Sequence, residues 1–317
     1  MKKTIFASGQ TNHFSMLHNP TTQSSMEGIV HKPFLHLFCT SMVAFALLLS
    51  PGRAYGQCPA TTYTVGSGVG IPNLSDGPPG LANMVGGSVK IWGTFTVDED
   101  TWSLLGVDVY LRTFDAVINV NSGCTLDARP NPNNNVRTKF ENCPGVPSWS
   151  GIQVLSGGTA YLIDCIVFRA CTAVDLRPGS KAQITGNTFI SNFYSIDVEG
   201  ATTLLGEGIA HNTFLPPPSD LGCSIGTNPY AIKLNNVPDI VIGDIAQSGE
   251  PNTMVDYPTG IHATNSNLTV YNTTIAYHPD VHSAAIRLIG NGGVFQATIN
   301  GLGNTPTSPE LINDCGR

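Results

Sequence analysis

The sequence predicts an all-β fold, a right-handed parallel β-helix in which each turn of the solenoid, or rung, takes about 22 residues. Three observations support this prediction. An apolar-x-apolar triplet recurs along the chain, two further apolar segments follow most triplets, and only 12% of the residues are charged while 34 of 317 are glycine. Scarce charge and frequent glycine favour short strands joined by tight turns over long helices.

The triplet defines the rungs. Its copies are Ile152-Gln153-Val154, Val174-Asp175-Leu176, Ile196-Asp197-Val198, Ile232-Lys233-Leu234, Ile261-His262-Ala263 and Ile286-Arg287-Leu288. Successive copies begin 22, 22, 36, 29 and 25 residues apart, and such periods are typical of solenoids. Because alternate residues of a strand face opposite sides, we expect the outer members in the core and the middle member in solvent. Stacked rungs then bury a core that one rung cannot bury alone.

Two further strands complete each rung. The second segment covers residues 160–162, 182–184, 239–242 and 267–270, and the third ends at Phe168, Phe189, Phe214, Met254 and Ile275. Asparagine recurs near the third segment, at Asn187, Asn212, Asn252 and Asn272. Asparagine tolerates the left-handed backbone of a tight corner, and stacked amides hydrogen-bond from rung to rung, so we assign these residues a structural role. The 36-residue interval predicts an inserted surface loop at residues 215–229.

The repeat sets the domain organisation. We expect one β-helix over residues 87–303, whose first strands, at 89–97, 107–111 and 117–120, belong to less regular rungs or a cap. Residues 57–86 are rich in glycine and proline, lack periodicity and predict an irregular N-terminal cap or a loose segment. Residues 304–317 show no strand pattern and predict an irregular C-terminal end.

Residues 1–56 are predicted to be a signal peptide with a long n-region. Residues 34–50 form an apolar run preceded by Lys32, and Ala54-Tyr55-Gly56 places small residues at the two positions that signal peptidase requires. We therefore expect cleavage before Gln57 and a secreted or cell-surface product. An uncleaved membrane anchor is the alternative, since about 17 apolar residues is the lower limit for a spanning helix. A start at Met16 or Met26 would shorten the n-region.

The net charge of the chain limits the classes of molecule that the protein is expected to bind. Residues 1–56 contain four of the 15 basic residues and one of the 22 acidic residues, so their removal changes the formal charge from −7 to −10. Nucleic acid is excluded as a partner by this balance. After signal cleavage we expect no membrane association.

The eight cysteines predict disulfides rather than a metal site. They occur at positions 39, 58, 124, 143, 165, 171, 223 and 315, and no Cys-x-x-Cys is present. In an oxidising compartment we expect Cys124 to pair with Cys143 and Cys165 with Cys171. Cleavage of the leader removes Cys39, so one thiol stays free or the chain is a fragment of a longer protein.

The run Trp149-Ser150-Gly151-Ile152-Gln153-Val154, followed by Gly157-Gly158 and by Asn-Thr-Phe repeats, resembles the right-handed parallel β-helix proteins exported by bacteria, which share a pectate-lyase-like fold. The resemblance covers about residues 87–300 and implies architecture only. Proteins of this fold include pectate lyases, polygalacturonase-type hydrolases, adhesins and surface proteins without known activity.

The catalytic motifs that the resemblance would imply are incomplete. The hydrolase branch uses Asn-Thr-Asp, Asp-Asp, Gly-His-Gly and Arg-Ile-Lys, whereas here Asn-Thr precedes Phe, Met or Thr and Gly260-Ile261-His262 replaces Gly-His-Gly. The lyase branch uses Arg-x-Pro-x-x-Arg, which Arg129-Pro130 and Arg177-Pro178 do not complete. No nucleophile elbow, phosphate loop or zinc motif occurs.

The candidate functional residues are the middle members of the triplets. Gln153, Asp175, Asp197, Lys233, His262 and Arg287 are predicted to form a column on one exposed sheet, about 4.8 Å apart. Asp175 and Asp197 then become neighbours, which like charges disfavour. Such a pair suits Ca²⁺, the one cofactor that the pattern suggests, or the acid and nucleophile of a retaining glycosidase. An ordinary solvated surface is the third interpretation.

Two classes of function follow. The first is a non-catalytic scaffold, secreted or on the cell surface, that binds an extracellular polysaccharide or another surface component. The second is a polysaccharide lyase or glycoside hydrolase acting along the exposed sheet. The incomplete motifs favour the scaffold, and the depth of any groove along the column is expected to distinguish the two classes.

Overall fold

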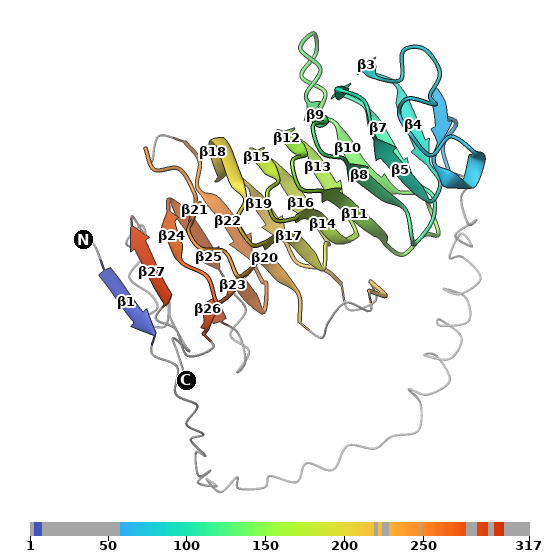
Figure 1. The fold of residues 1–317 in the computed structure, drawn as a ribbon. Coiled ribbons are helices and arrows are strands. Elements are labelled where there is room, and N and C mark those ends of the chain that lie inside the picture. The colour runs from blue at the N-terminus through green and yellow to red at the C-terminus, as the bar shows by residue number, and fades with distance from the viewer. Residues whose placement is uncertain are drawn as a thin grey trace, which may run out of the picture. The chain divides into compact units, whose positions relative to one another are not determined.

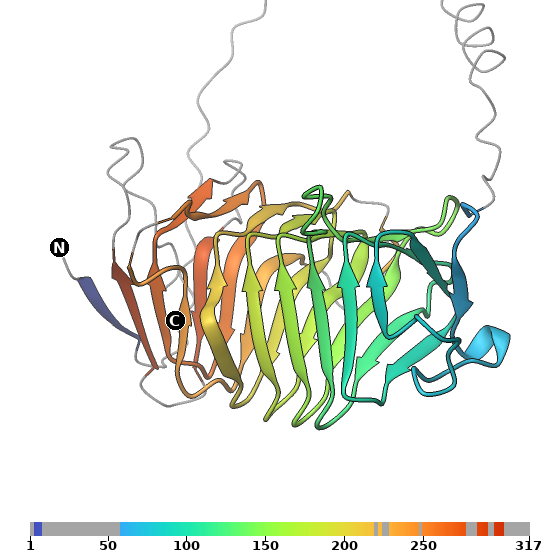
Figure 2. The same cartoon turned by 90° about the horizontal axis from the view of Figure 1, so that it is seen from above.

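A computed structural model describes residues 3–7, 58–218, 221–223, 228–246, 249–276, 284–290 and 295–300. These residues form strands and turns, and the one helical element among them is a single 3₁₀ turn, η1 (Ser67–Val69). The strands gather in three sheets, and from β3 onward each sheet takes every third strand of the chain. The chain therefore visits each sheet once per turn, which makes a parallel β-helix (Figures 1 and 2). The predicted all-β solenoid is confirmed.

Sheet A contains the second strand of each rung. Its strands are β3 (Asn83–Val85), β6 (Thr101–Leu105), β9 (Thr125–Arg129), β12 (Thr159–Ile163), β15 (Lys181–Thr185), β18 (Thr203–Ala210), β21 (Ile240–Ile242), β24 (Leu268–Tyr271) and β27 (Phe295–Asn300), followed in space by β1 (Lys3–Ala7). All neighbours in sheet A are parallel except β1, which pairs antiparallel with β27.

Sheet B contains the third strand of each rung, and all its neighbours are parallel. Its strands are β2 (Tyr63–Val65), β4 (Ser88–Ile91), β7 (Asp108–Leu111), β10 (Lys139–Asn142), β13 (Ile166–Phe168), β16 (Thr188–Ile190), β19 (Thr213–Leu215), β22 (Asn252–Val255) and β25 (Thr273–Ala276). The pairing begins at β2 and β4, so residues 57–86 contribute strands as well as turns.

Sheet C contains the triplets, again with parallel neighbours throughout. Its strands are β5 (Thr94–Val97), β8 (Val117–Val120), β11 (Trp149–Val154), β14 (Ala170–Leu176), β17 (Tyr194–Glu199), β20 (Tyr230–Asn235), β23 (Thr259–Thr264) and β26 (Ala284–Ile289). The strand register aligns successive triplets in the way that the spacing predicts.

The core follows from the alternation of side chains along these strands. The outer triplet residues Ile152, Val174, Ile196 and Ile232 are fully buried. Fully burying such a side chain contributes about 1.5–3 kcal/mol, so each added rung stabilises the stack. On sheet B, stacked Phe189 and Phe214 rings, 5.1 Å apart, continue the same core.

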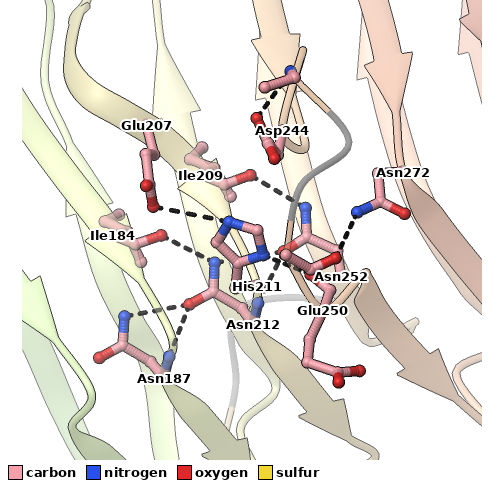
Figure 3. A network of polar contacts seen from close by, with 12 residues as sticks. Ile184, Asn187, Glu207, Ile209, His211, Asn212, Asp244, Glu250, Asn252 and Asn272 are labelled. Carbon is pink, nitrogen blue, oxygen red and sulfur yellow. Dashed lines mark hydrogen bonds and ion pairs between the residues drawn. The ribbon is translucent and has the colours of Figure 1, made fainter.

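A ladder of buried asparagines runs along one corner of the solenoid (Figure 3). Asn187 Nδ2 donates to Asn212 Oδ1 at 3.0 Å, and Asn212 Nδ2 donates to Asn252 Oδ1 at 3.3 Å. The predicted structural role is therefore confirmed for these three residues. The left-handed backbone lies one residue earlier, at Gly186 and His211. Asn272 is half-exposed and donates instead to the Gly249 carbonyl.

The 36-residue interval corresponds to the connection between β19 and β20. Within it, the described residue Leu221 is buried and Cys223 forms a disulfide with Cys171 of β14. The inserted segment is thus fastened to the solenoid at two neighbouring points, and the strands on either side keep their places in the sheets.

The predicted disulfide pairs are wrong. Cys58 pairs with Cys143 and Cys171 with Cys223, across 85 and 52 residues of sequence, whereas Cys124 and Cys165 are buried free thiols. The prediction favoured cysteines close in sequence, but in a solenoid the rung register decides which residues meet. Cys165 lies in the core, where its Sγ contacts the Ala128 and Ile163 carbonyl oxygens.

Two predicted segments fall outside the described residues. The signal peptide, residues 1–56, lies there apart from β1, and so does the C-terminal end at 304–317. Among the described residues, no helix has the length and apolarity needed to cross a membrane.

Candidate binding surface on sheet C

The structure brings the predicted column together. Asp175 lies opposite Gln153 on one side and Asp197 on the other, and Lys233, His262 and Arg287 continue the row. We call this row the sheet C column. Neighbouring members stand on adjacent parallel strands, which lie about 4.8 Å apart. Gln153 and Arg287, which are 134 positions apart in sequence, thus share one face.

Each aspartate of the column has a cationic partner. Arg177 Nη2 lies 2.8 Å from Asp175 Oδ2, and Lys233 Nζ lies 2.8 Å from Asp197 Oδ2. Gln153 Nε2 also donates to Asp175 Oδ2, at 3.0 Å. These contacts offset the repulsion that neighbouring carboxylates would otherwise feel.

A second row of polar side chains runs beside the column, two residues further along each strand. Arg177 contacts Asp175 through Nη2 and Glu199 through Nη1, the latter at 2.6 Å from Oε2. Asn235 follows Glu199 in the strand register. Two cationic side chains and three carboxylates therefore lie close together on this part of sheet C.

Burial keeps Asp197 from behaving as an isolated carboxylate. Burial raises its pKa above the ordinary value, the Lys233 ammonium acts in the opposite direction, and the Asp175 charge adds to the rise. The protonation of Asp197 therefore depends on the Lys233 contact.

An aromatic stack that the triplet pattern does not predict borders the column. The Tyr194 and Tyr230 rings are parallel at 5.4 Å, and the His262 ring continues the stack at 4.4 Å from Tyr230. Lys233 Nζ lies 4.8 Å above the Tyr194 ring. The signal was available, because Tyr194 and Tyr230 each stand three residues before a column member.

His262 is the least exposed member of the column. Burial, together with the Arg287 and Lys233 charges, lowers its pKa to about 4. Its Nε2 lies 3.3 Å from Thr264 Oγ1, and its buried Nδ1 has no hydrogen-bond partner among the described residues. The imidazole is therefore neutral near pH 7 and fills space in the aromatic stack.

A hollow of about 280 Å³ opens over the acidic half of the column. Its lining is Thr172, Asp175, Arg177, Tyr194, Asp197, Glu199, Lys233 and Asn235. Small-molecule pockets measure about 300–1,000 Å³, so the hollow is slightly smaller than that range. His262 and Arg287 belong to the column but do not line the hollow.

The donor set suits Ca²⁺ poorly. Calcium takes six to eight oxygen ligands, whereas Asp175 and Asp197 already contact Arg177 and Lys233. The described residues also contain no group of three or more His, Cys, Asp or Glu side chains placed to hold a metal. Calcium would have to displace both cationic side chains.

Comparison with models of known protein families, with curated proteins and with solved structures finds no significant match to this chain. The parallel β-helix is therefore assigned from the chain's own strand pairing.

Proposed function

We propose that the protein is a secreted or cell-surface scaffold that binds a glycan at the hollow on sheet C. The observation that supports this proposal is that three carboxylates, a guanidinium, an ammonium and an amide line one hollow. Sugar hydroxyl groups both donate and accept hydrogen bonds, so they match a surface that offers donors and acceptors side by side. Because the charges nearly balance, a neutral sugar fits better than a strongly charged one.

The disulfides support the proposed location outside the cytosol. Structural disulfides persist in oxidising compartments and are rare in the cytosol, and two occur among the described residues. Together with the predicted signal peptide, they favour export. N-terminal sequencing of the protein recovered from the medium or envelope tests this: a start at Gln57 supports export by cleavage, and a product that retains residues 34–50 contradicts it.

A glycan array probed with the chain from Gln57 onward tests the binding proposal. The double variant Asp175→Asn with Asp197→Asn removes both column carboxylates and is expected to weaken binding at least tenfold. The matched control is Asp108→Asn, which removes a carboxylate near Lys139 (4.0 Å) on sheet B and is expected to change nothing. Equal binding by all three proteins would overturn the proposal.

A glycoside hydrolase or lyase is the second candidate, and the raised pKa of Asp197 beside Asp175 favours it. Retaining glycosidases use two carboxyl groups about 5–5.5 Å apart whose pKa values differ. Release of reducing ends from a glycan bound on the array, abolished by Asp197→Asn, would identify an enzyme. Binding without cleavage would identify the scaffold.

A further inference from the structure

Sheet A is interrupted between β18 and β21. These neighbouring strands share one paired position, Ile209 with Ile242, whereas β21 and β24 share three. Among the described residues, those of β18 before Ile209 therefore have no strand partner on that side. We call the resulting cleft between β18 and β21 the seam.

Extra residues in β18 account for the interruption. Ala182 and Ile184 of β15 pair with Leu204 and Ile209 of β18. An advance of two residues in β15 therefore corresponds to an advance of five residues in β18. Gly206 and Gly208, on either side of Glu207, adopt left-handed backbone with φ of 55° and 71°. Glycine reaches this conformation without steric cost, and such bulges end strand pairing.

The seam encloses about 540 Å³, within the range of ligand pockets. Its apolar lining comes mainly from Leu204, Ile240, Val241 and Ile245. Ile245 is 65% exposed, more than any other large apolar side chain in the described part of the chain. Covering an apolar cleft of this kind with a partner removes apolar surface from water, which favours binding.

The charged groups of the seam are all acidic. Glu207, Asp239 and Asp244 line it, and no lysine or arginine does. Figure 3 shows Glu207 on β18 and Asp244 just after β21, and the His211 ring next to Glu207. His211 Nε2 lies 3.5 Å from Glu207 Oε2, and the nearest lysine in the strand register, Lys181 of β15, is on the far side of β18.

We propose that the seam is a docking site for an extended segment of another polypeptide in which apolar side chains alternate with lysine or arginine. Strand addition to unpaired sheet edges supplies backbone hydrogen bonds, and alternate side chains then face opposite sides of the sheet. The apolar side chains enter the cleft, and the basic ones meet the three carboxylates. Thr202 Oγ1, buried in the seam lining without a hydrogen-bond partner among the described residues, gains one.

The test uses fluorescence anisotropy with a labelled peptide, Val-Lys-Val-Lys-Val-Lys, and the chain from Gln57 onward. We expect it to bind at least tenfold more tightly than Val-Glu-Val-Glu-Val-Glu. A Val-Lys peptide N-methylated at every second amide keeps its charge but loses backbone donors on one edge, and is expected to bind at least tenfold more weakly.

Variants of the protein locate the site. Ala246→Trp fills the exposed mouth of the seam and is expected to weaken binding at least tenfold. The double variant Glu207→Gln with Asp239→Asn, which keeps shape and removes charge, is expected to weaken it at least fivefold at low salt. The matched control is Val85→Trp at an exposed position of β3, with no expected effect. Circular dichroism confirms the fold of each variant.

Three outcomes would overturn the proposal. Equal binding of the basic and acidic peptides, or no binding of either, removes the charge argument. Full binding by both seam variants places the peptide elsewhere. Self-association of the chain that Ala246→Trp abolishes, without peptide binding, assigns the seam to a second copy of this protein.

Discussion

Sheets A and C are built from the same rungs. Across the 36-residue interval between the triplets at Ile196 and Ile232, sheet C keeps its strand pairing and sheet A does not. In sheet C, β17 and β20 share five paired positions although the inserted segment separates them. In the same two rungs of sheet A, β18 and β21 share one. The insertion on the way to β20 lies in a connection between strands, whereas the extra residues of β18 lie inside a strand. Length added in a connection preserves the register, and length added in a strand breaks it.

The asparagine ladder holds the rungs together where sheet A is interrupted. Asn252 Nδ2 donates to the Ile209 carbonyl at 2.9 Å, and Asn212 Nδ2 to the Ile184 carbonyl at 2.8 Å. Tyr257 adds a buried hydroxyl, 3.0 Å from Ser195 Oγ and 3.1 Å from the Asn192 carbonyl. Buried side-chain hydrogen bonds thus link two rungs that share only one paired position in sheet A.

The largest expected effect breaks the regular sheet. Ile196→Asp places an unpaired charge in the core of sheet C and is expected to destabilise the protein by about 4 kcal/mol or more. Asp197→Asn, the next residue along, faces outward and is expected to cost about 1 kcal/mol through the loss of the Lys233 pair. Chemical denaturation measures both, and equal losses would mean that the assigned alternation is wrong.

A smaller effect is expected at the interruption. Asn212→Ala removes four hydrogen bonds that link three rungs and is expected to destabilise the protein by about 2–4 kcal/mol. Asn272→Ala, at the half-exposed end of the series, is the matched control and is expected to cost less than about 1 kcal/mol. If the two changes have the same effect in denaturant titrations, the ladder does not stabilise the seam.

The column adds a dependence of stability on pH. The folded-state pKa of His262, about 4, is below its ordinary value of 6.5. The unfolded chain therefore takes up a proton first, and the stability present above pH 6.5 falls as the pH decreases toward 4. Allowing for solvent screening, the loss is about 1–2 kcal/mol. Urea titrations at pH 7 and 4.5 should show this loss in the native chain and a smaller one in His262→Gln.

The smallest expected effect concerns calcium. Because Arg177 and Lys233 already pair with the column carboxylates, added Ca²⁺ is expected to shift the melting temperature by less than about 1 °C. A clear rise that disappears in the double variant Asp175→Asn with Asp197→Asn would show that the ion displaces these cations.

Much of sheet C was predictable, and little of the chemistry around it was. The triplets place Asp175 beside Asp197 because both stand in the middle of the pattern and one rung apart. The pattern predicts repulsion there but not the pairing of Asp175 with Arg177, which lies two residues further along the chain. Strand alternation places both side chains on the same face, and the orientation that joins them depends on Glu199 in the next rung.

The sequence by itself determined the solenoid, the buried triplet residues and the column, because these depend on local alternation repeated at a regular period. Only the tertiary structure decided which cysteines pair, where sheet A opens and which cation meets which carboxylate. These features depend on the register between rungs, which connections and bulges of irregular length shift by amounts that no local pattern encodes. Gly206-Glu207-Gly208 illustrates this limit, because a short run of ordinary turn residues separates two strands that the repeat alone would pair.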